Sequence, residues 1–150
     1  MTVAGDHVEL GLAGGSGVDH SGIRAGSVLC DPRAPVPLAS ALEVHVRTLE
    51  LGIPLTPGLA CELYCHAGAT AATVEAIIAS LDKRGGRVVA PTPPRAVCSN
   101  AGAALRLRLE RPGCFELYSA CRPMGRAVLR EAGRTIAYGI VTALVADESQ

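Results

Sequence analysis

The chain has 150 residues, of which 49% are hydrophobic, so it is long enough to bury one sizeable core. Only 3% of the residues are aromatic and none is tryptophan, so valine, leucine, isoleucine and alanine must fill that core. The formal net charge is zero, which predicts no general attraction to nucleic acid. No apolar run approaches the roughly 20 residues of a membrane-spanning helix, and we therefore expect no membrane partner.

The beginning of the chain does not have the pattern of a secretory signal. Asp6 and Glu9 stand where a signal peptide would have a basic region followed by an apolar block. Without a signal, the six cysteines are expected to be reduced thiols rather than a disulfide framework. We therefore expect a cytoplasmic protein.

Two segments near the start, 6–12 and 23–30, have the pattern of β-strands. Two strands can neither close a barrel nor bury a face alone, so we expect the chain to be a fragment. Residues 32–39 contain three prolines and are predicted to form an extended linker. The predicted division is therefore 1–31, the linker 32–39, and a folded unit 40–150.

After the linker, the sequence repeats the period-two alternation of half-buried strands. In 41–49 the inward-facing set would be Leu42, Val44, Val46 and Thr48. The same alternation or a β-prone run marks 59–66, 103–109, 126–130 and 135–141. The segment 73–81 is ambiguous, because Val74, Ile77, Ile78 and Leu81 also fit a helical period. Without that segment as a helix, the pattern predicts an all-β barrel or sandwich of about six or seven strands.

The stretch from Met124 to Val141 has the pattern of a basic hairpin. Its connection, Glu131-Ala132-Gly133, supplies a glycine that can adopt a positive φ. Gly125 and Gly139 lie inside the pattern, where a missing side chain allows another backbone to come close or the strand to bend.

Five segments in series give the chain a resemblance to a known family. The sequence Gly-Arg-x-x-Leu-Arg-x-x-Gly-Arg-Thr-Ile-Ala-x-Gly at 125–139 closely resembles the C-terminal barrel of the EF-Tu-like translational GTPases. The other four are Val-Leu-Cys-Asp-Pro at 28–32, Ile-Pro-Leu-Thr-Pro-Gly at 53–58, Leu-Asp-Lys at 81–83 and Glu-Arg-Pro at 110–112. The resemblance extends from about Asp6 to Val145.

This resemblance implies a closed antiparallel barrel of six to seven strands in which 73–81 is a strand. Residues 1–31 would be the end of the middle barrel (domain II), and 40–150 would be the C-terminal barrel (domain III). The implied function is docking of a tRNA, or of a tRNA-mimic protein such as a Pelota-like or release-factor-like factor, and of the GTPase domain. The ribosome would be reached through the full-length protein.

The same resemblance implies that GTP and Mg²⁺ are bound by a separate GTPase domain. The glycine-rich segment 14–17 lacks the Gly-Lys-Ser/Thr ending of a phosphate-binding loop, and no Asn-Lys-x-Asp segment for guanine recognition is present. No catalytic, cofactor-binding or metal-binding residue is therefore predicted, and no GTP hydrolysis by this chain.

Within the family, Leu-Cys-Asp-Pro at 29–32 and Glu-Leu-Tyr-Ser-Ala-Cys-Arg at 116–122 look most like the ribosome-rescue GTPase that partners Pelota. The termination-factor GTPase is next, and the tRNA-carrying elongation factor differs at 132–135. Ala127 stands where the family usually has phenylalanine, and Tyr138 replaces a small residue. We expect Tyr138 to fill the volume that Ala127 leaves empty.

Arg126, Arg130 and Arg134 are the candidate partner-binding residues of the hairpin. Guanidinium groups pair well with carboxylates and phosphates, so an interface role for a protein or RNA partner is one interpretation. The other is structural pairing within the domain, with arginine stems covering apolar surface. The sequence leaves both open.

The cysteines allow a rival function. Cys61 and Cys65 lie four residues apart, which on a strand is ~13 Å and too far for one metal ion to bridge. Core thiols are the better interpretation. A stand-alone enzyme with a cysteine nucleophile, such as Cys65 with His45 or His66, is the alternative, and a non-functional gene fragment is a third possibility.

Overall fold

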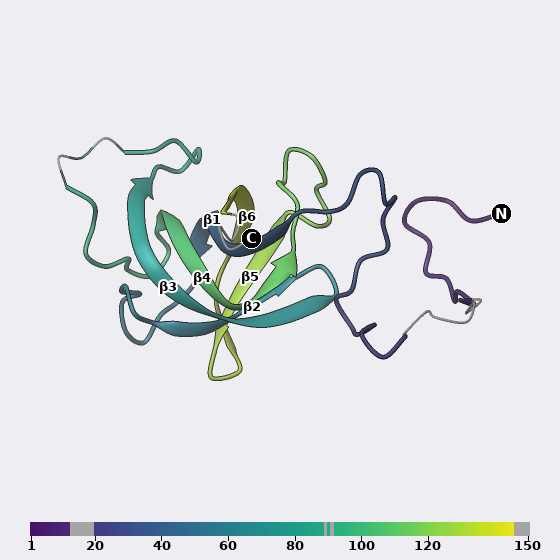
Figure 1. Ribbon diagram of the computed structural model, residues 1–150. Coiled ribbons are helices and arrows are strands. Elements are labelled where there is room, and N and C mark those ends of the chain that lie inside the picture. The colour runs from purple at the N-terminus through teal and green to yellow at the C-terminus, as the bar shows by residue number, and fades with distance from the viewer. Residues whose placement is uncertain (13–19, 89, 91, 146–150) are drawn as a thin grey trace.

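The computed structural model describes residues 1–12, 20–88, 90 and 92–145. In this part of the chain six antiparallel strands form a closed barrel in the order β1-β4-β3-β2-β5-β6, and none of the described residues is helical (Figure 1). The strands are β1 (Leu38–Thr48), β2 (Ala60–Cys65), β3 (Gly68–Leu81), β4 (Gly102–Cys114), β5 (Arg126–Glu131) and β6 (Arg134–Val145). The predicted all-β closed barrel is confirmed.

The barrel closes on β1, which pairs with β4 along one edge and with β6 along the other. The predicted inward set of this strand is confirmed, because Leu42, Val44, Val46 and Thr48 are all buried. Leucines of the other strands, including Leu63, Leu105, Leu107 and Leu129, complete the core. Each such side chain contributes about 1.5–3 kcal/mol by leaving water, so an aliphatic core is sufficient without tryptophan.

The ambiguous segment 73–81 is part of strand β3, as the resemblance implies. Two register shifts in its pairing with β4, between Val74 and Ala76 and between Ile77 and Ala79, explain its helix-like spacing. An extra residue at a bulge moves the next inward position by one. Val74 and Ile77 are therefore both buried although they are three residues apart.

The strands expected in 6–12 and 23–30 are not formed. Among residues 1–12 and 20–37 the structure contains turns and irregular backbone but no strand. Their apolar side chains, such as Leu10, Ile23 and Leu29, are exposed. The physical reason is that two isolated segments without a sheet to join have no face to bury. The division at 31 and 39 stays a prediction, and residues 146–150 of the last unit lie outside the described part.

The β5–β6 hairpin turns through two residues, Ala132 and Gly133, with φ of 47° and 77°. Two consecutive positive φ values are typical of the type I′ turn, whose twist matches that of the flanking strands. The predicted glycine is therefore where the turn needs it. Glu131 belongs to the strand.

The two glycines predicted to allow close backbone approach do so. A Cβ atom on Gly139 would lie 1.9 Å from the carbonyl oxygen of His45, and one on Gly125 would lie 2.3 Å from the Cα atom of Tyr118. Gly139 is thus required where β6 pairs with β1 and closes the barrel.

The expectation that Tyr138 fills space beside Ala127 is wrong. Ala127 is 1% exposed and points into the barrel, whereas Tyr138 is 49% exposed. Ala127 pairs with Gly139 and Val128 with Tyr138. Since successive residues of a strand point to opposite faces, Tyr138 lies on the outside of the sheet.

Replacing Gly139 with alanine should destabilise the barrel strongly. The added methyl group collides with the His45 carbonyl, so we expect the free energy of unfolding to fall by at least ~3 kcal/mol in urea denaturation. Gly52→Ala is the matched control, because nothing lies within 4 Å of a Cβ atom there. Equal stability of the two variants would show that closure does not depend on Gly139.

Candidate functional site

The outer surface of β2, β5 and β6 carries the three candidate arginines. Arg126 and Arg130 point outward from β5 because the alternate residues Ala127 and Leu129 are buried. Arg134 is exposed at the first position of β6. Cross-strand pairing places Tyr64 beside Val128 and Val128 beside Tyr138, a row of one aliphatic and two aromatic side chains. We call this surface the basic hairpin face: Tyr64, Arg126, Val128, Arg130, Arg134 and Tyr138.

Arg130 has a structural role in this face. Its guanidinium carbon lies 5.4 Å from the centre of the Tyr64 ring, and its Nη2 atom donates a hydrogen bond to the Gly133 carbonyl. A cation over an aromatic face contributes about 0.5–1 kcal/mol at an exposed site. Its Nε atom is buried without a partner among the described residues. Arg130 therefore fastens the hairpin turn to β2.

Arg134 and Arg126 differ in how they are held. Arg134 donates from Nη2 to the Glu50 carbonyl over 3.3 Å, which joins the start of β6 to the loop after β1. Arg126 is exposed and makes no hydrogen bond or ion pair within the described ranges. The structure thus gives two of the three arginines internal contacts, both to backbone carbonyls. An interface role for any of them stays a prediction.

Other arginines of the barrel are neutralised by acids. Arg106 pairs with Glu43 at 2.7 Å, and Arg87 approaches the same carboxylate at 3.8 Å. Arg108 pairs with Glu75. The three hairpin arginines have no carboxylate within 4 Å in the described part of the chain, so the basic hairpin face keeps its positive charge.

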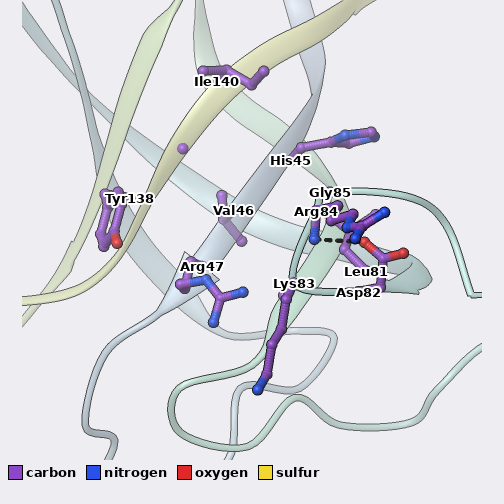
Figure 2. Close-up of a pocket in the computed structure, with 12 residues that line it drawn as sticks. His45, Val46, Arg47, Leu81, Asp82, Lys83, Arg84, Gly85, Tyr138 and Ile140 are labelled. Atoms are coloured by element: carbon purple, nitrogen blue, oxygen red, sulfur yellow. Dashed lines mark hydrogen bonds between the residues drawn. The ribbon is translucent and has the colours of Figure 1, made fainter.

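A second feature of the surface is a hollow of about 440 Å³ between β1, β6 and the turn after β3 (Figure 2). Gly102 of β4 pairs with Arg47 of β1 and with Leu81 of β3, and Leu81 lies close against it. We call this hollow the turn groove. It is lined by His45, Val46, Arg47, Leu81, Asp82, Lys83, Arg84, Gly85, Gly102, Tyr138, Gly139 and Ile140.

The groove has no arrangement for catalysis. Burial lowers the pKa of His45, and the nearby Arg87 lowers it further, whereas Glu43 raises it. No serine, threonine or cysteine lines the groove with it. The Asp82 carboxylate accepts hydrogen bonds from the amides of Arg84 and Gly86, each at 2.8 Å, and is engaged in its own turn. The arrangement can bind but has no group positioned for chemistry.

The sequence did not indicate this groove. Arg47 and Lys83 are 36 positions apart, and no local pattern joins the two segments that carry them. The signal is Gly102, a glycine at the start of the strand between them.

The cysteines are placed as the core-thiol interpretation predicts. Cys61 is buried, and Cys65 is partly buried with its thiol donating to the Met124 carbonyl at 3.0 Å. Burial raises the pKa of each thiol to about 11. His45 lies on β1, which does not neighbour β2 in the barrel, so it cannot serve Cys65 as a base. Among the described residues no three metal-ligating side chains come together.

The glycine-rich segment 14–17, considered as a phosphate loop, lies outside the described residues. The described part of the chain contains no helix of the length and apolar character that crossing a bilayer requires.

Comparison with known proteins agrees with this barrel. Protein HBS1 of Drosophila melanogaster is 32% identical over 139 residues, which are 93% of this chain and 20% of that protein. The eukaryotic peptide chain release factor GTP-binding subunit of Zygosaccharomyces rouxii is 28% identical over 145 residues, 97% of this chain and 21% of that protein. The chain therefore spans about a fifth of the length of these curated relatives.

A solved structure and a family profile cover the same region. Sup35 complexed with GDP matches with a TM-score of 0.80 and 26% identity, over 85% of this chain and 31% of that chain. A profile described as "GTP-eEF1A C-terminal domain-like" matches residues 41–142, which is nearly all of the described barrel. The chain therefore belongs to this family of C-terminal β-barrel domains, which it shares with the translational GTPases above.

Proposed function

We propose that this barrel is a docking module of a ribosome-rescue or termination GTPase. It presents the basic hairpin face to a tRNA-mimic protein factor, Pelota-like or release-factor-like, and packs against the GTPase domain of the full-length protein. The observation that carries the proposal is Arg126, an exposed cation whose side chain has no hydrogen-bond or ion-pair partner among the described residues, beside the row of Tyr64, Val128 and Tyr138.

The chemistry of this face favours a protein partner over tRNA. Tyrosine and arginine are enriched at protein interfaces, where an aromatic row supplies buried area and an arginine fork pairs with carboxylates. A phosphate track would need more cations than the three arginines here, two of which already donate to carbonyls. The relatives named HBS1 and release factor GTP-binding subunit support the rescue and termination branches.

The division of labour is part of the proposal. GTP and Mg²⁺ are bound and GTP is hydrolysed by another domain, since the chain's sequence has neither the phosphate-binding nor the guanine-recognition motif. This barrel contributes a rigid, fully paired surface, and the protein acts in the cytoplasm through the ribosome.

Reversing the charge of Arg126 tests the docking surface. Arg126→Glu should weaken binding to a purified Pelota-like or release-factor-like protein by about tenfold, because a carboxylate replaces the free cation at the interface. Calorimetry of the 150-residue chain with each factor measures this, and unfolding in urea should be unchanged because the side chain is exposed.

Arg111→Glu is the matched control, an exposed arginine on β4, which does not neighbour β5. If both substitutions weaken binding of the factor equally, the loss comes from the change in net charge and not from the basic hairpin face. If tRNA binds the chain and neither protein factor does, the partner is tRNA and the proposed protein partner is wrong.

Thiol reactivity tests the claim that the barrel does no cysteine chemistry. With a pKa of about 11, only about 0.1% of Cys61 and Cys65 is thiolate at pH 8. We expect both to react with iodoacetamide roughly a hundredfold more slowly than the exposed Cys30 and Cys98. Mass spectrometry of quenched samples measures the rates, and denaturation should make them equal. Fast alkylation of Cys65 in the folded chain would restore the nucleophile hypothesis.

A further inference from the structure

The turn groove gathers three cations from distant parts of the chain. Arg47 comes from the end of β1, and Lys83 and Arg84 come from the turn after β3. Figure 2 shows Arg47 between Tyr138 and Lys83, with the turn on the other side of the groove. Gly102 of β4 pairs with both Arg47 and Leu81, so the two cationic segments lie on either side of it.

These charges are not neutralised inside the barrel. Arg47 donates from Nη1 to the Asn100 carbonyl at 3.3 Å, which leaves its charge uncompensated. The side chains of Lys83 and Arg84 make no hydrogen bond or ion pair with another residue of the described ranges. The single carboxylate of the groove, Asp82, is held by the amides of its own turn. Asp82 still contributes one negative charge, so three cations less one anion leave two uncompensated positive charges in the groove, which a bound anion would offset.

The walls beside these cations are partly apolar. Ile140 and the exposed ring of Tyr138 line the groove on one side of Arg47 and Lys83. A second hollow, of about 510 Å³, adjoins it and shares Arg47, Leu81, Asp82, Lys83 and Gly102. Its other lining residues include Ala96 and Ala101 together with the polar Ser80 and Asn100. The two hollows therefore share their cations, with Tyr138 and Ile140 at one end and a mixed polar and apolar lining at the other.

This arrangement fits an acidic peptide better than a nucleic-acid strand. A nucleic acid would require cations repeated along the groove and aromatic rings for successive bases. Here the cations lie together at the centre, the lining contains a single aromatic ring, Tyr138, and the remaining side chains are a mixture of small apolar and polar groups. A carboxylate flanked by apolar side chains matches both the charge and the walls.

We propose that the turn groove binds an extended acidic segment of a partner protein. A carboxylate of the segment lies between Arg47 and Lys83, and apolar side chains on either side of it enter the two hollows. This site does not involve Arg126, Arg130 or Arg134, and it shares only Tyr138 with the basic hairpin face.

A short synthetic peptide tests the proposal. The probe is labelled with fluorescein and has glutamates at its centre and a leucine and a phenylalanine on each side. Fluorescence anisotropy with the 150-residue chain should show saturable binding. The same peptide with glutamine in place of glutamate should bind about tenfold more weakly, because the central carboxylates are lost. Equal binding of the two peptides would overturn the proposal.

Two charge-reversal variants locate the site. Lys83→Glu/Arg84→Glu should weaken the peptide by about tenfold or more, whereas Arg111→Glu/Arg122→Glu, which lowers the net charge equally at exposed positions, should change it less than about twofold. Equal losses would mean general charge attraction and would overturn the proposal.

Two further measurements keep the result interpretable. Lys83→Gln/Arg84→Gln removes the two cations without adding negative charge, and it replaces the Lys83→Glu/Arg84→Glu variant in the binding assay if that variant does not fold. A fluorescein-labelled single-stranded RNA tests the competing ligand class. If the RNA binds saturably, loses its binding in the Lys83/Arg84 variants, and the peptide does not bind, the ligand of the groove is a nucleic acid and not an acidic peptide.

Discussion

The antiparallel pairing of β6 with β1 is the contact on which the rest of the structure depends. Gly139 lies so close to the His45 carbonyl that no other residue fits between the two backbones. This seam converts six strands into a closed barrel, which leaves no edge for pairing with other chains. It also sets the register that places Tyr138 beside Arg47 and Ile140 beside His45. Both surfaces discussed above follow from that register.

Local pattern predicts the fold where strands are regular. In β1 alternation alone predicted the correct inward set, because the strand is half-buried and the register shift between Glu43 and Val44 places its extra residue, Thr142, on β6. In β3 two bulges change the spacing of buried residues, so periodicity favoured a helix and only the family resemblance indicated a strand. The first 31 residues show the opposite failure. Strand-like sequence at 6–12 and 23–30 does not become a sheet without neighbours.

The sites could be predicted only in part. Sequence placed Arg126, Arg130 and Arg134 on one hairpin, but their different contacts depend on Tyr64, the Gly133 carbonyl and the Glu50 carbonyl, which pairing brings near. The failed expectation for Tyr138 has the same origin. Side-chain volume suggested that it compensates Ala127, yet adjacent register positions place the two on opposite faces. The turn groove depends on β4 lying between β1 and β3, which no local motif encodes.

The arginines of this barrel differ in whether a carboxylate or a backbone carbonyl holds them. Glu43 and Glu75 neutralise arginines on the faces of β1, β3 and β4. In contrast, Arg47, Arg130 and Arg134 donate to carbonyls, which fixes their position without cancelling their charge. Surface ion pairs contribute only about 0–1 kcal/mol, so leaving these cations without acids costs the fold little. What the barrel gains is a set of oriented positive groups on rigid strands. An arriving carboxylate then finds its partner already in place and needs little reordering of side chains, which reduces the entropic cost of binding.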